Sequence, residues 1–326
     1  MQGKDPSEQE PRPKSNAGID VSKHWLDAHV LPSGQSLRVP NTRDGIRKLK
    51  RWLGRFEMAL IVLEATGKWH RPLHRSLHAS GLATAVVDPF RVRMFAKAQG
   101  VFAKTDRLDA RVLAQFAAVM TPASRPPAPE LMEELAELVT ARESAVAEET
   151  SLKNQRAAAN TAFLKRQLAR RMASLAKVIA ALEREILARI RDDAALERRY
   201  AILTSIPGIG FVAAVTLIAG MTELGTCNAK QVSMLAGLAP IADESGERQG
   251  VRVVWGGRPR LRRALYLAGL SAARFNVDMT TFYRRLVDNG KAAKLAVIAV
   301  ARKLVILANT LIAEDRTWSP SPPKHA

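Results

Sequence analysis

Cysteine is almost absent from this chain, and aromatic residues are few. Cys227 is the single cysteine among 326 residues, which excludes a disulfide framework and a zinc site built from several cysteines. Phe, Trp and Tyr together make up 5% of the residues, so stacking of rings on nucleic-acid bases is not the expected main mode of contact. The cysteine usage predicts a protein of a reducing compartment.

Acidic residues are scarce relative to basic ones. The chain has 50 Lys and Arg against 31 Asp and Glu, a formal net charge of +19 and a pI near 10.7. So large an excess of positive charge predicts a polyanionic partner, with nucleic acid ahead of an anionic membrane surface. Because aromatic residues are few, we expect arginine contacts to the phosphate backbone.

Long hydrophobic runs are lacking as well. The polar, proline-bearing residues 1–14 have no apolar stretch of the signal-peptide kind, and we expect them to form a disordered tail. The apolar run at 212–221 is too short to cross a bilayer. We therefore expect a soluble, cytoplasmic protein without a membrane partner.

The segment 15–121 has the pattern of an α/β domain. Three short strand-like runs are followed by a helical pattern with Thr42 as a plausible N-cap, then by a buried strand that ends in "LEATG". Helix, strand and helix patterns alternate after that. Three meandering strands followed by this alternation predict a mixed sheet covered by helices, in the order of a ribonuclease H-like fold.

Glycine and proline are missing between residue 131 and residue 198. A proline-rich break at 121–130 precedes this stretch, in which apolar residues recur at intervals of three and four. The segment 122–198 is therefore expected to form long helices, as an antiparallel pair or a coiled coil that spaces or oligomerises domains. A mostly helical C-terminal domain, 199–315, and a tail, 316–326, are expected to follow.

The C-terminal domain opens with a helix-hairpin-helix pattern, "AILTSIPGIGFVAAVTLIAGM". Gly208 and Gly210 would let the hairpin backbone approach a phosphate, whose oxygens can accept amide hydrogens at the start of the second helix. An ordinary tight turn between two helices is the alternative.

Four carboxylates have positions that suit a metal site. Asp20 lies inside the first strand, Glu64 ends the fourth strand, and Asp106 and Asp109 open the last helix of the domain. No Lys or Arg stands three or four residues from either Asp106 or Asp109 to offset their repulsion. In a ribonuclease H-like sheet the first and fourth strands are neighbours and that helix crosses their ends, so all four would converge. Oxygen ligands of this kind suit Mg²⁺, with Mn²⁺ possible, for phosphoryl transfer.

Each carboxylate also has an ordinary explanation. Asp106 can complement the dipole of its helix, Asp20 can face water from an edge strand, and Glu64 can belong to a loop.

A serine with arginines beside it forms the second candidate site. Ser245 lies in a polar, glycine-flanked loop, and no acid interrupts the arginine-rich stretch that follows it. The arginines, predicted to bind DNA or RNA, are Arg248, Arg252, Arg258, Arg260, Arg262 and Arg263. A hydroxyl beside such a surface suits attack on a phosphodiester, because arginines hold the phosphate and offset developing charge. A turn-forming serine is the alternative.

Several motifs occur together, in order, over nearly the whole chain: "GIDVSK", "LEATG", "KTDRLDAR", "SIPGIG", "LAGLAP", "ESG" and "GGRPRLRRALY". The combination resembles the DEDD transposases of the "IS one-ten / eleven-eleven" insertion-sequence group, described as bridge-RNA-guided recombinases. The resemblance implies a RuvC-like domain whose four acids, here Asp20, Glu64, Asp106 and Asp109, bind Mg²⁺. It also implies a coiled coil and a catalytic serine, here Ser245, that forms a covalent phosphoserine link with DNA.

The resemblance further implies partners. These are DNA, a structured noncoding guide RNA whose loops pair with target and donor DNA, and a homotetramer in which the acids of one protomer meet the serine of another. Glu244 and Glu247 beside Ser245 are a less usual feature of this sequence. Two other hypotheses stay open: a RuvC-like nuclease in which water attacks, and a non-catalytic nucleic-acid-binding protein.

Overall fold

The computed structural model describes residues 14–65, 67–101, 106–241 and 253–320, without the side chains of residues 106–108. The chain divides into two compact units, Met1–Ala128 and Pro129–Ala326. The first is an α/β unit and the second is mainly helical, so the helices predicted over 122–198 belong to the second unit.

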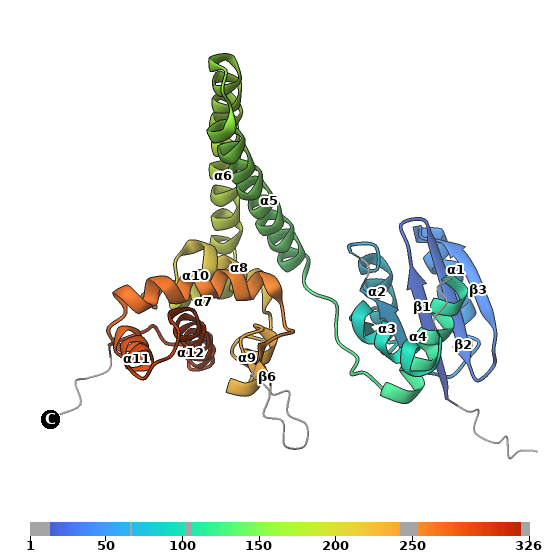
Figure 1. Ribbon diagram of the computed structural model, residues 1–326. Helices are drawn as coiled ribbons and strands as arrows, with labels where there is room; N and C mark the ends of the chain where they lie inside the picture. Colours follow the sequence, from blue (N-terminus) through green and yellow to red (C-terminus); the bar gives the residue numbers. More distant parts are fainter. Residues whose placement is uncertain (1–13, 66, 102–105, 242–252, 321–326) are drawn as a thin grey trace, which may run out of the picture. The chain divides into compact units, whose positions relative to one another are not determined.

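A five-stranded mixed sheet forms the centre of the first unit (Figure 1). Its strands lie in the order β3-β2-β1-β4-β5, with β2 antiparallel to both β1 and β3, and β4 parallel to both β1 and β5. The bounds are β1 Ser15–Val21, β2 Trp25–Leu31, β3 Ser36–Pro40, β4 Met58–Glu64 and β5 Thr84–Val87. The predicted mixed sheet is confirmed, and its topology is consistent with a ribonuclease H-like fold.

Helices cover both faces of this sheet. They are α1 (Arg43–Leu53), α2 (Arg71–His78), α3 (Pro89–Ala98) and α4 (Asp106–Met120). The Thr42 side chain caps α1 as predicted, because its Oγ1 accepts a hydrogen bond from the Gly45 amide at 3.2 Å. Strand residues alternate between the faces: Ile19 and Leu63 pack with α1 and α2, whereas Val62 packs with α3 and α4.

The second unit begins with a long helical hairpin, α5 (Glu130–Ala158) and α6 (Ala162–Arg191), which extends away from the other helices of the unit (Figure 1). The remaining elements are α7 Ala194–Ser205, α8 Phe211–Gly220, α9 Ala229–Leu235, β6 Pro240–Ile241, β7 Val253–Val254, α10 Pro259–Phe275, α11 Val277–Asp288 and α12 Ala293–Ala313. A mainly helical C-terminal region is thus confirmed, including two helices, α7 and α8, joined by the predicted Pro-Gly-Ile-Gly hairpin.

The core of the second unit surrounds α12. By length and composition this helix could cross a membrane, with a mean hydropathy of 2.0. Its Val300, Leu304 and Ala308 are fully buried and pack in one cluster with residues of α7, α8 and α10. This burial is that of a core helix in a folded unit.

The hairpin of α5 and α6 has two different halves. Near the other helices, Leu135 and Ile186 join the main core of the unit. Toward the tip, Leu152, Ala159 and Leu168 form a small separate cluster in which the two helices pack against each other.

Candidate active site and nucleic-acid interface

Asp20 and Glu64 occupy matching positions on neighbouring strands. β1 and β4 pair in parallel with Ile19 opposite Leu63, and Asp20 and Glu64 are the next residue on each strand. Both are half-buried. Because side chains alternate along a strand, both lie on the face opposite Ile19 and Leu63, which is the face that α3 and α4 cover.

Gly18 brings α4 unusually close to β1. A Cβ atom at this position would lie 2.2 Å from both the Ala110 carbonyl oxygen and the Ala114 amide nitrogen, and 2.5 Å from the Leu113 Cβ. Gly18 and Asp20 are two residues apart and share a face. Helix α4 therefore crosses the sheet beside Asp20, at a distance that a residue without a side chain allows.

The first turn of α4 lies toward the carboxyl ends of β1 and β4. The residues that follow the end of α4 at Met120 lie beside Thr84, the first residue of β5. The Thr84 amide donates a hydrogen bond to the Ser124 Oγ at 3.0 Å, and the Arg125 amide donates one to the Thr84 carbonyl at 3.3 Å. The end of α4 is thus near the amino end of β5, and its start is at the opposite edge. Asp20 and Glu64 stand at that edge.

Positions 106 and 109 lie on the sheet-facing side of α4. Each precedes by one turn a residue that contacts Gly18, namely Ala110 and Leu113. Asp109 is half-buried, and the side chain of Asp106 is outside the described part of the structure. The topology thus brings all four backbone positions to one edge of the sheet.

A further carboxylate, Asp27 on β2, was not among the sequence candidates. It pairs directly with Asp20 across the antiparallel strands, so the two side chains share a face. Asp27 is 6% exposed, and its Oδ2 lies 3.4 Å from the Nη2 of Arg38 on β3. The three-residue connection between β1 and β2 was the available signal, because it places residues 20 and 27 opposite each other.

Ser245 lies outside the described residues, together with Glu244, Glu247, Arg248 and Arg252. The two ends of its segment are held side by side, because β6 and β7 form an antiparallel ribbon that pairs Pro240 with Val254 and Ile241 with Val253. At the base of the ribbon a Cβ on Gly257 would lie 2.3 Å from the Gly237 amide nitrogen. The ribbon is thus anchored by close backbone packing.

Three of the predicted nucleic-acid-binding arginines have partners inside the protein. The Nη2 of Arg258 lies 2.7 Å from the Glu223 Oε1, and the Nε of Arg260 lies 2.7 Å from the Glu143 Oε2. Arg262 donates to the Gly256 carbonyl. Arg263 is exposed, and its side chain has no ion pair or hydrogen bond within the described residues.

These contacts attach α10 to the rest of the unit. Glu223 follows α8 and Glu143 belongs to α5, so Arg258 and Arg260 connect the start of α10 to both. Any phosphate bound by these two arginines would have to share them with a carboxylate, whereas Arg263 has no such competition among the described residues.

Comparison with known proteins assigns both units. Residues 17–164 match a DEDD transposase family, and residues 200–284 match the transposase IS116/IS110/IS902 family. The chain belongs to the IS110/IS116/IS902 family of DEDD transposases.

The relatives of this transposase include proteins named for DNA inversion. It is 26% identical to the pilin gene-inverting protein of Moraxella bovis over 94% of this chain and 98% of that protein, and equally similar to the one of Moraxella lacunata. An uncharacterized 42 kDa protein of insertion element IS900 from Mycobacterium paratuberculosis is 30% identical over 46% of this chain and 39% of that protein. Membership of the family implies an enzyme that binds, cuts and rejoins DNA.

The four predicted acids of the transposase carry the kind of donor atom that a divalent metal ion needs. Asp20, Glu64 and Asp109 provide carboxylate oxygens, the ligands that Mg²⁺ and Mn²⁺ prefer. Among the described side chains, no group of three or more His, Cys, Asp or Glu is arranged to hold an ion. The described acids, Asp20, Glu64 and Asp109, thus do not form a gathered ligand set by themselves, and the side chain of Asp106 is not described, so the four-ligand site stays a prediction.

The two hairpin glycines of the transposase differ in their surroundings. Gly208 has a φ of +107°, and a Cβ there would lie 2.5 Å from the Cβ of Ala272, so this glycine packs the hairpin onto α10. Asn276, which is 1% exposed, donates to the Pro207 carbonyl at 3.3 Å. Gly210 precedes α8 with no atom within 4 Å of its Cβ position. Of the two glycines, Gly210 has the space that a phosphate needs.

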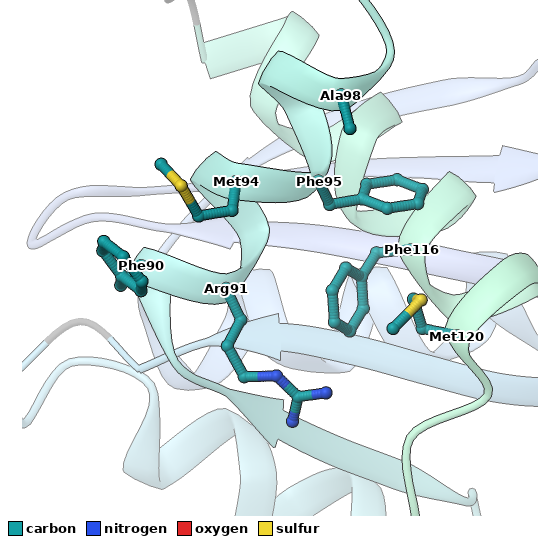
Figure 2. A pocket seen from close by; sticks show the side chains of 7 residues that line it. All are labelled: Phe90, Arg91, Met94, Phe95, Ala98, Phe116 and Met120. Carbon is teal, nitrogen blue, oxygen red and sulfur yellow. The ribbon is translucent and has the colours of Figure 1, made fainter. Parts of the chain in front are cut away.

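An apolar groove of about 400 Å³ lies between α3 and α4 of the transposase (Figure 2). Its lining residues are Phe90, Arg91, Met94, Phe95, Ala98, Phe116 and Met120. The Arg91 guanidinium lies over the Phe116 ring, 5.9 Å from its centroid. Among the described residues that line the groove there is no carboxylate.

Proposed function

We propose that this transposase cleaves and rejoins DNA through attack of the Ser245 hydroxyl on a phosphodiester, assisted by a divalent cation held by Asp20, Glu64, Asp106 and Asp109. One observation supports the proposal most strongly. Asp20 and Glu64 stand in matching register on β1 and β4, under the helix whose first turn carries the other two acids.

Each strand exchange would conserve phosphodiester energy. The Oγ of Ser245 forms a bond to phosphorus as the bond between phosphorus and a deoxyribose oxygen breaks. The serine proton passes to a general base, and the leaving deoxyribose oxygen takes up a proton. A DNA hydroxyl then attacks the phosphoserine, which restores the serine and joins a new pair of strands. Bound Mg²⁺ would supply charge stabilisation at the phosphate oxygens. Arg263, which is exposed on α10, would hold a nearby phosphate.

The proposal extends to the partners of the reaction. A structured guide RNA would choose the DNA by base pairing, in keeping with a protein of net charge +19 and 5% aromatic residues, which suits backbone contact. The acids and the serine belong to separate units, Met1–Ala128 and Pro129–Ala326. This division permits a homotetramer in which the acids of one protomer and the serine of another form one site. The tetramer would work in the bacterial cytoplasm.

A covalent-adduct assay tests the proposal. The full chain, the noncoding RNA transcribed from the DNA beside its gene, and DNA carrying the element ends would be incubated with Mg²⁺ and then denatured. We expect a protein–DNA adduct for the wild type and for Ser174→Ala, a control serine that is exposed on α6. We expect none for Ser245→Ala, and a loss of cleavage of at least 100-fold for Asp20→Asn and on addition of EDTA.

Two results would overturn parts of the proposal. Strand cleavage by Ser245→Ala without an adduct would identify a nuclease in which water is the nucleophile. Unchanged recombination by Asp20→Asn would remove the metal role of the acidic edge.

A further inference from the structure

The charged side chains in the distal half of the α5–α6 hairpin are all basic over a long stretch. Residues 150–182 contain seven basic side chains and no Asp or Glu. The seven are Lys153, Arg156, Lys165, Arg166, Arg170, Arg171 and Lys177. All seven are exposed. A helical pair that served as a spacer alone would gain nothing from this concentration of like charge.

Three of these cations form a line on the outer face of α6. Leu168, Met172 and Leu175 point inward, because they pack in the small cluster that joins the two helices. At 100° per residue, positions 166, 170 and 177 point almost directly away from that cluster. We call Arg166, Arg170 and Lys177 the outer stripe.

The outer stripe has no internal partner in the part of the chain that the structure describes. Within the described residues, none of its three side chains forms an ion pair or a hydrogen bond. Other cations of the hairpin do: Arg171 lies 3.5 Å from Glu148, and Lys153 lies 2.9 Å from Glu149. The acids of α5 thus serve the flanks of the hairpin, and the outward charge of α6 is left for an external partner.

We propose that the outer stripe binds the phosphate backbone of duplex DNA, so that the hairpin is a DNA-contacting arm as well as a connector. This inference rests on the proposed function in taking DNA as the substrate. Eleven residues separate Arg166 from Lys177, about 16 Å along the helix axis, and a DNA duplex of that length carries about ten phosphates. Phe163, which is 65% exposed, continues the stripe toward the tip and offers a surface to deoxyribose.

Charge decides against a second copy of the hairpin as the occupant of the stripe. Two such surfaces placed face to face would bring together six unneutralised cations, which repel one another. A duplex instead releases condensed counterions when arginine and lysine replace them, and this release favours binding.

The salt dependence of DNA binding tests the proposal. Anisotropy titrations of a labelled 30-base-pair duplex would be run at 50 to 200 mM salt with EDTA present, so that no chemistry occurs. Arg166→Gln/Arg170→Gln/Lys177→Gln removes three phosphate contacts, so the negative slope of log K against log salt should become shallower by about 2.7. Between 50 and 200 mM salt, the variant would then lose about 40-fold less affinity than the wild type.

A charge-matched variant in the first unit is the control. Arg43→Gln/Lys48→Gln/Arg51→Gln removes three exposed cations of α1. We expect the slope to change by less than about 0.9, which is the contribution of one phosphate contact. Equal changes for both variants would show a net-charge effect and overturn the proposal, as would an unchanged slope for the stripe variant.

Two further arms separate other partners from DNA. A slope change on an RNA duplex of the same sequence but not on DNA would overturn the proposal in favour of RNA, and a changed oligomeric mass with an unchanged DNA slope would point to a second copy. Circular dichroism should show unchanged helix content, because the stripe residues have no described partner. The titration measures binding without chemistry, because EDTA is present throughout. Failure to find a serine–DNA adduct would therefore count against the proposed function and would not change the outcome of this binding test.

Discussion

Replacing Gly18 by alanine would separate the two elements that bring the four acids together. The added methyl group would meet the Ala110 carbonyl oxygen and the Ala114 amide nitrogen, each at 2.2 Å. These are backbone atoms inside a helix, so a side-chain rotation cannot relieve the clash. Helix α4 or strand β1 has to move.

The size of the movement follows from the contact distance. Ordinary van der Waals contact begins at 3.4 Å, so α4 must shift by about 1 Å relative to Gly18. Overpacking of this kind costs about 1–3 kcal/mol of folding free energy. A displacement of about 1 Å between groups that act together can lower a reaction rate by about 100-fold. Asp106 and Asp109 would move with α4, whereas Asp20 and Glu64 would stay with the sheet.

Two measurements on the full chain check this prediction. With an m value of about 2 kcal/mol per molar urea, the unfolding midpoint of the first unit should fall by about 0.5–1.5 M. Strand cleavage should fall by about 100-fold under conditions where the variant is fully folded. Gly54→Ala is the matched control, since its Cβ would be 3.5 Å from the nearest atom at a φ of −64°, and it should keep both properties. Wild-type cleavage by Gly18→Ala would refute the link between this contact and the site.

Two other predictions concern different parts of the chain. Gly208→Ala should destabilise the helical unit by about 2–4 kcal/mol in urea unfolding, because this position combines a φ of +107° with a clash against Ala272. Gly210→Ala should change the stability by less than about 0.5 kcal/mol, because nothing lies within 4 Å of its Cβ position. Equal effects of the two substitutions would contradict this difference in packing. Burial and then the Arg111 charge lower the pKa of His29 from 6.5, so the unfolded chain takes up the proton more readily and stability should fall as the pH drops below 6.5. His29→Gln should reduce the loss of stability between pH 7.5 and pH 5.5, and an undiminished loss would refute this assignment.

Local patterns in the sequence were sufficient for the elements of the first unit. Alternation of apolar residues marks a strand whether or not its partner is known, and Thr42 caps α1 because capping depends on the residues of one turn. Position 20 inside a strand and position 64 at the end of another were visible for the same reason. The long helices after residue 130 likewise follow from a stretch without glycine or proline.

Pairings between distant residues could not be read in this way. The arginines of "GGRPRLRRALY" look alike in sequence, yet Arg258 pairs with Glu223 after α8 and Arg260 pairs with Glu143 on α5, whereas Arg263 has no carboxylate partner within the described residues. Gly208 and Gly210 look equivalent as well, and the neighbour of Gly208 on α10 distinguishes them.

From the amino-acid sequence we could predict the order of strands and helices, the excess of positive charge and the candidate acids, because these depend on composition and on neighbours along the chain. The folded backbone was needed to show that Gly18 lets α4 lie against β1, and that the outer stripe of α6 lacks internal partners among the described residues. The physical reason is that close contacts and ion pairs join residues far apart in the chain, and their partners are known once the backbone has folded.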